Sequence, residues 1–225
     1  MKKIAATLCL LATAAVAFGQ GSVGAGNTTT TLFRTNSTAG GGTAGSATST
    51  AGGPWLYEVL TAPSTVTSVD ASLQSLLSAP WSDTGLTASN TGLAGRMSAG
   101  SGNVNFWPAG QTNSFVIVGW NAAAGASWAQ VAGRLSGATL SGGSWSGGGI
   151  ASGMFVGATT LGFRQAGGVV GGNTIPTASL FGAGPDQQGS PVTTPTDMFT
   201  NVPEPSSFAL AGLGIAAMTI FRRRR

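Results

Sequence analysis

The sequence predicts a mostly β protein: a single β-sandwich-like domain, of jelly-roll or Ig-like type, with loops rich in glycine and serine. Two observations lead to this prediction. Seven short runs have strand-like composition and are separated by Gly, Ser, Asn and Pro. Charged residues make up only 7% of the chain while 37 residues are glycine, a balance typical of a β protein with many turns.

The strand-like runs are short and regularly spaced, as in a sandwich. They comprise residues 31–34, 55–60, 104–107, 114–120, 134–140, 154–163 and 197–202. Within the fourth run, residues 115–118 are continuously apolar, which is typical of a strand buried on both faces. We expect this strand to be central.

A single helix is expected within this domain, over residues 70–79. Leu73, Leu76 and Leu77 lie at helical spacing behind Asp70, a candidate cap, and Pro80 follows. Two stretches, 36–53 and 141–153, consist largely of small residues and are expected to be flexible loops.

The N-terminal residues 1–19 have the three parts of a signal peptide. Lys2 and Lys3 precede an apolar run over 4–16, and small residues follow. Cleavage by signal peptidase after Ala17 or after Gly19 is compatible with these residues. We therefore expect an N-terminal signal helix, export, and a mature domain over residues 20–201.

The C-terminal residues 202–225 also have three parts in a fixed order. Pro203, Glu204 and Pro205 come first, a largely apolar stretch over 208–221 follows, and four consecutive arginines come last, Arg222, Arg223, Arg224 and Arg225. As a helix, the apolar stretch would be about 21 Å long, somewhat short of a bilayer core of about 30 Å. We expect a short transmembrane helix whose arginines act as stop charges in the cytoplasm.

This order resembles the PEP-CTERM sorting signal of exported proteins of Gram-negative bacteria. The resemblance implies that an exosortase-type membrane protease recognises the motif Pro203, Glu204 and Pro205. It also implies a transient stay in the inner membrane, and then the cell surface or the extracellular matrix. The prolines keep the backbone extended and stop a helix from leaving the membrane, which suits a processing site.

Parts of the body also resemble those of PEP-CTERM proteins. One is the Gly-Pro-aromatic strand around residues 53–60, and another is the strand at 115–121 that ends in Trp120 before a turn of small residues. In that family these features belong to compact β domains, so the resemblance supports the fold.

The basic pI of 10.2 does not indicate nucleic-acid binding. The lysines and four of the arginines lie in the terminal segments, and residues 20–202 carry a formal charge of −1. No basic stripe remains to neutralise phosphates, so we expect no nucleic-acid partner.

Residues 20–202 contain no His, Lys or Cys, since the single cysteine is Cys9. Ser-His-Asp and Cys-His nucleophiles, Schiff-base lysines and His or Cys metal sites therefore lack essential members. We expect no catalytic, cofactor or metal site, and a protein that is not an enzyme. Catalysis by carboxyl groups remains possible, and the candidate residues for it are Glu58, Asp70, Asp83, Asp186 and Asp197.

The leading functional hypothesis is an exported structural protein of the cell surface or of the polysaccharide-containing extracellular matrix. A first alternative is a carbohydrate-binding module whose exposed tryptophans stack on sugars. Trp145 is the candidate residue because Gly and Ser flank it in an expected loop. A less favoured alternative is an acid-pair glycoside hydrolase.

Overall fold

The computed structural model describes residues 19–36, 54–97, 100–182 and 189–202. In this part of the chain the protein is mostly β, which confirms the expected fold class. The expected signal helix, the segment 37–53 and the expected transmembrane helix lie outside the described residues.

A five-stranded antiparallel sheet forms the centre of the domain. Its longest strand, β6, pairs along its whole length with β3. The other edge of β6 is shared by two short strands, β9 near its end and β10 near its start. The bounds are β3 Trp55–Pro63, β4 Ser82–Ser89, β6 Thr112–Asn121, β9 Val156–Ala158 and β10 Gly162–Gln165.

A second sheet of three strands, in the order β13-β1-β5, packs against one face of the first, and three strand pairs complete the β structure. The pair β14-β2 is parallel, while β7-β8 and β11-β12 are antiparallel hairpins. The bounds are β1 Gln20–Gly24, β2 Phe33–Thr35, β5 Ser101–Pro108, β7 Ala138–Ser141, β8 Ser144–Gly147, β11 Gly168–Val170, β12 Asn173–Ile175, β13 Ala178–Ser179 and β14 Thr196–Met198.

Alternate residues of β3 and β6 build two separate cores, because successive side chains of a strand point to opposite faces. Phe115 and Ile117 belong to the core between the two sheets. Val116 and Val118 belong to a second core on the other face. The prediction that residues 115–118 form a central strand covered on both faces is confirmed.

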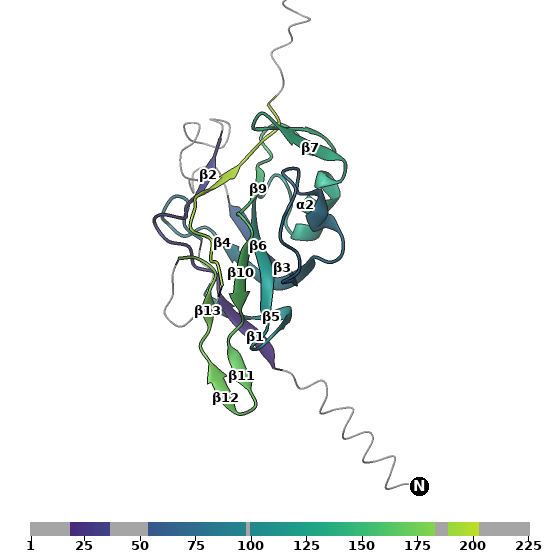
Figure 1. Cartoon of the computed structure of the whole chain (residues 1–225). Helices are drawn as coiled ribbons and strands as arrows, with labels where there is room; N and C mark the ends of the chain where they lie inside the picture. Colours follow the sequence, from purple (N-terminus) through teal and green to yellow (C-terminus); the bar gives the residue numbers. More distant parts are fainter. Residues whose placement is uncertain (1–18, 37–53, 98–99, 183–188, 203–225) are drawn as a thin grey trace, which may run out of the picture.

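The second core is closed by the helix α2, Trp128–Leu135, the 3-10 turn η3, Gln74–Leu77, and the β7-β8 hairpin. In Figure 1 these elements lie on the side of the central sheet away from β13. The sandwich therefore carries an additional layer, which explains why residues 115–118 of the central strand are apolar on both faces.

Two local predictions were wrong. Residues 70–79 form no α-helix: Leu73 has a left-handed backbone with φ of 56°, so only the turn η3 follows it. Asp70 does cap this turn, because its carboxylate accepts the backbone N–H groups of Gln74 and Ser75 at 3.0 and 2.7 Å. The expected strand over 134–140 is the end of α2 followed by β7.

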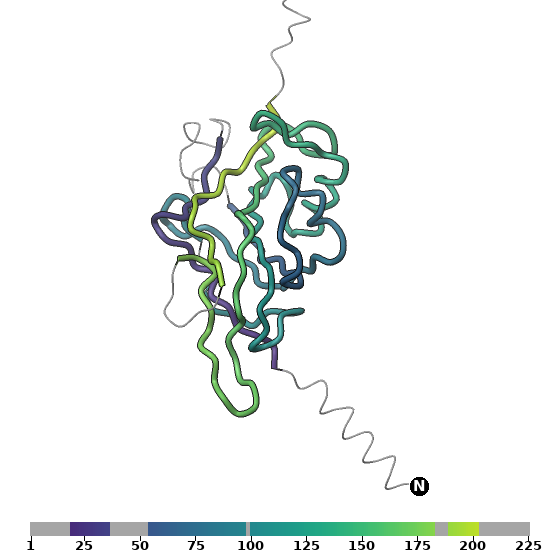
Figure 2. Tube along the Cα trace, in the orientation of Figure 1, coloured from purple at the N-terminus to yellow at the C-terminus, as the bar shows by residue number. Residues whose placement is uncertain are grey.

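The start of β1 and the segment after β14 lie at opposite ends of the body, as the purple and yellow parts of the trace show (Figure 2). In the residues that the structure describes, no helix is both long and apolar enough to span a membrane.

Candidate functional site

Trp145 is not an exposed loop residue. It lies on β8, and only 1% of its surface is exposed. Its Nε1 donates a hydrogen bond to the carbonyl of Val156 at 3.1 Å, which ties the ring to the central sheet. The expected flexible loop 141–153 contains this strand, because Gly142 and Gly143 form the tight turn of the β7-β8 hairpin. The prediction that Trp145 stacks on a sugar is therefore wrong.

The same holds for the other tryptophans. Each of the six exposes 7% or less of its surface and belongs to one of the two cores: Trp55, Trp81, Trp107, Trp120, Trp128 and Trp145. Carbohydrate binding through exposed tryptophan rings has no structural basis in this domain.

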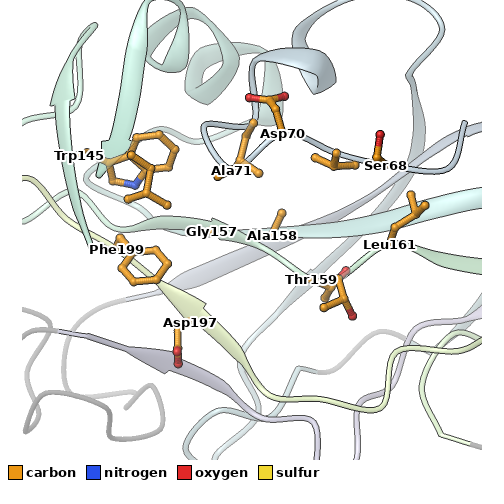
Figure 3. A pocket seen from close by; sticks show the side chains of 14 residues that line it. Ser68, Asp70, Ala71, Trp145, Gly157, Ala158, Thr159, Leu161, Asp197 and Phe199 are labelled. Atoms are coloured by element: carbon orange, nitrogen blue, oxygen red, sulfur yellow. The ribbon is translucent and has the colours of Figure 1, made fainter. Parts of the chain in front are cut away.

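A hollow of about 440 Å³ lies beside Trp145, between the loop that precedes η3 and the segment of β9 and β14 (Figure 3). Two carboxylates lie on opposite sides of it, Asp70 and Asp197, and both point away from the hollow. Asp70 caps η3, and Asp197 forms an ion pair with Arg34 at 2.8 Å. The hollow is thus lined mainly by apolar groups and backbone, with no carboxylate free to act in it.

A second cleft, of about 490 Å³, brings two of the five candidate carboxyl groups together. Glu58 comes from β3 and Asp83 from β4, and their side chains form a hydrogen bond. The pairing register of the two strands shifts here, with Glu58 opposite Thr87 but Leu60 opposite Asp83. Gly85, with φ of 74°, provides the positive backbone angle that this bulge requires.

Glu58 is the only side chain in the described structure that burial turns into a neutral acid at neutral pH. Only 4% of its surface is exposed. Burial raises its pKa to about 8, and the hydrogen bond and negative charge of Asp83 act in the same direction. The backbone N–H of Trp128, at the start of α2, bonds to the carboxyl group and opposes this rise. The carboxyl group of Glu58 therefore links β3, β4 and the first turn of the helix.

The geometry of this pair differs from that of a glycoside hydrolase. In such enzymes two carboxyl groups flank the scissile bond about 5 to 9.5 Å apart. Hydrogen-bonded oxygens are only about 3 Å apart, which leaves no space for a sugar linkage between them. Asp70 and Asp197 line the other hollow, and Asp186 lies outside the described residues. No group of three or more potential metal ligands occurs among the described residues.

The last described residues are fixed firmly to the body. Phe199 and Val156 exchange two backbone hydrogen bonds of 2.9 Å. The Thr200 carbonyl accepts from the Trp145 N–H at 3.1 Å, and the Val202 N–H donates to Ser144 Oγ at 2.9 Å. The folded domain thus extends to the residue before Pro203. The residues predicted to be read by the sorting protease, and the four arginines, lie outside the described part.

Comparison with known families identifies the motif in the C-terminal segment. The model of the PEP-CTERM protein-sorting motif matches residues 201–225. The chain carries a PEP-CTERM protein-sorting motif. The PEP-CTERM motif marks an exported protein that is sorted to the cell surface through the membrane and processed by an exosortase, a membrane protease. No curated protein and no solved structure matches the chain.

Proposed function

We propose that the domain is a non-enzymatic structural or adhesive component of the cell surface or extracellular polymer matrix of a Gram-negative bacterium. The observation that carries the proposal is the direct continuity of the folded domain with the PEP-CTERM motif. Hydrogen bonds hold the chain as far as Val202, and the matched motif covers residues 201–225. The β domain is therefore the cargo that the motif delivers.

Two features of the domain support a non-enzymatic role. Residues 20–202 lack His, Lys and Cys, which removes most nucleophiles and bases. The closest approach to an acid pair combines the almost fully buried Glu58 with the exposed Asp83, and the two carboxyl groups are too close together to hold a glycosidic bond between them. The contacts of Glu58 with β4 and α2 instead suit a structural role, in which it holds these elements to β3.

The experiment is to follow the protein in its source bacterium with and without the exosortase gene. An antibody raised against the folded domain detects it in inner-membrane, surface and matrix fractions. We expect surface and matrix location in the wild type, with a mature C-terminus that lacks Arg225 by mass spectrometry. Retention in the inner membrane is expected without the exosortase, or when Pro203, Glu204 and Pro205 are all replaced by alanine.

The structural role has its own readout. Matrix from a strain lacking the protein should be mechanically weaker or less cohesive than wild-type matrix, and re-expression should restore it. Unchanged cohesion, or an exported protein that retains Arg225, contradicts the proposal.

A further inference from the structure

One aromatic side chain of the second sheet points into solvent. Phe106, on β5, is 70% exposed, while its neighbour Trp107 is 1% exposed. A regular strand would place one of these residues in the core and the other outside, and the neighbouring core residue Val104 predicts the reverse assignment. The strand is irregular here: partners of β1 change from Val104 to Pro108 between adjacent residues.

The backbone at Phe106 is strained in a way that keeps the ring outside. Its φ is 61°, a left-handed conformation that is rare for a bulky residue. Trp107 holds this arrangement, because its ring stacks on Phe115 with centroids 6.0 Å apart and its Nε1 donates to the Gln111 carbonyl at 2.9 Å. Strain of this kind persists where the surroundings enforce it, and it gathers at functional sites.

A small pocket of about 200 Å³ opens beside this ring. Its lining contains hydroxyl and amide side chains, two prolines and the phenyl ring, and it contains no charged group. The residues are Thr61, Ala62, Pro63, Pro80, Ser82, Phe106, Gln111 and Asn113. Four of these residues are apolar and four carry hydroxyl or amide groups, so the lining offers a stacking surface together with hydrogen-bonding groups.

Asn113 is a buried residue of the lining that holds one wall of this pocket in place. Its side chain is 97% buried, and its Nδ2 donates to Thr61 Oγ1 at 3.1 Å and to the Phe106 carbonyl at 3.3 Å. Its Oδ1 has no hydrogen-bond partner. This oxygen exposes less than 1 Å² and is not open to a ligand, but the two bonds from Nδ2 fix the backbone of Phe106 and hold its ring beside the pocket.

We propose that this pocket binds a neutral sugar unit of a polysaccharide. The C–H face of the sugar stacks on Phe106, and its hydroxyl groups bond to the accessible polar side chains of the lining, Gln111 and Ser82. A phosphate or uronate ligand would need a cation, and neither Lys nor Arg lines the pocket. A protein partner would need a much larger apolar area than one ring and two prolines provide.

The location of the pocket suits this ligand, on the basis of the function proposed above. Asn113 lies near the start of β6 and Asn121 at its end, about 27 Å apart at 3.4 Å per residue. Asn121 bonds to the Gly153 carbonyl, and the Gly153 N–H bonds to Thr200, next to the sorting motif. The sugar pocket is therefore at the far end of β6 from Thr200 and from the start of the sorting motif.

The test is affinity electrophoresis and calorimetry with the purified exported protein. The probes are mannan, dextran, laminarin and the neutral polysaccharide fraction of the source bacterium's own matrix, with alginate as a charged comparison. We expect at least one neutral probe to retard the wild type, and alginate to have no effect.

The decisive variant is Phe106→Gly. Glycine tolerates the left-handed backbone, so the fold should be kept or stabilised while affinity falls roughly tenfold or more. Phe106→Tyr should restore binding. Leu93→Ala, which removes a side chain that is 67% exposed elsewhere on the surface, is the matched control and should bind as the wild type does.

Three results overturn the proposal: no binding of any neutral probe by the wild type, undiminished binding by Phe106→Gly, or an equal loss in Leu93→Ala. Each leaves the proposed structural role standing if the protein still reaches the surface and supports matrix cohesion. Conversely, sugar binding by a protein that never leaves the inner membrane would refute the surface role alone.

Discussion

The buried acid Glu58 makes the stability of this domain depend on pH in a direction opposite to that of most carboxylates. Its pKa in the folded protein is about 8, against an ordinary value of 4.5. Between these values the folded state holds a proton that the unfolded state has lost. The stabilising contribution is therefore complete below pH 4.5 and is lost as the pH rises through 8.

The magnitude follows from this interval. One pKa unit corresponds to about 1.4 kcal/mol, so the interval between 4.5 and about 8 sets an upper value of about 5 kcal/mol. This is comparable with the whole stability of a small domain. Burial contributes most, and Asp83 on β4 adds to it, while the Trp128 N–H on α2 opposes both.

The perturbation is Glu58→Gln, which resembles the protonated acid in shape and can still donate to Asp83. The assay is urea unfolding of the exported protein between pH 5 and 9, followed by the fluorescence of the buried tryptophans. Few other side chains should contribute to the pH dependence, because residues 20–202 contain no His or Cys, the side chains that ordinarily titrate in this range. We expect the free energy of unfolding of the wild type to fall by several kcal/mol, and that of Glu58→Gln to stay nearly constant.

The curves of wild type and variant should therefore converge at pH 5 and separate at pH 9, with the variant more stable. Asp197→Asn, which removes a half-exposed partner of Arg34, is the matched control and should retain the wild-type slope. Parallel curves for the wild type and Glu58→Gln would refute the assignment of Glu58 as a buried neutral acid.

Three further substitutions test the packing. Trp145→Ala should lower the free energy of unfolding by about 3–5 kcal/mol in urea titrations, because it removes a fully buried ring; a loss below about 1 kcal/mol would contradict its burial. Gly157→Ala should weaken the attachment of β14, since a Cβ there would meet the backbone of Asp197, and hydrogen exchange of the β14 amides should accelerate; unchanged exchange would contradict the contact. Asp70→Ala should cost about 1 kcal/mol by removing the cap of η3, again in urea titrations, whereas an unchanged midpoint would show the cap to be idle.

The strands that form the centre were predictable because each contains a run of consecutive, mostly apolar residues. The run at 114–120 became β6 nearly as expected, and 55–60 became the first part of β3. In contrast, β4 contains one large apolar residue, Leu86, and was not predicted. Its edge position allows alternating polar side chains that composition does not distinguish from a loop.

The sequence of helix α2 contains a helical pattern of apolar residues that was not predicted as a helix. Trp128, Val131 and Leu135 are its buried residues, and their spacing of three and then four is helical. The small residues before it suggested only a turn. Trp145 was misplaced for the opposite reason: its glycine and serine neighbours indicate a tight turn, but burial depends on which face of the hairpin meets the central sheet.

The pairing of Glu58 with Asp83 could not be derived from spacing. Both were among the candidate carboxylates, but they lie on separate strands, and the bulge at Gly85 sets which residues meet. The Phe106 pocket was likewise hidden, because the outward direction of the ring depends on an irregularity of β5. The C-terminal sorting motif, in contrast, was recognisable from local sequence alone.

The attachment of the last strand also determines how the domain would respond to force. A pull on the C-terminal tail acts along β14, which lies parallel to β2 and is bonded to β9 through Phe199 and Val156. Hydrogen bonds that run across the direction of pulling are loaded together in shear and do not open one after another. With its tail held at one end and a sugar chain bound at the other, the domain would carry tension along β3 and β6 as a load-bearing link between cell and matrix.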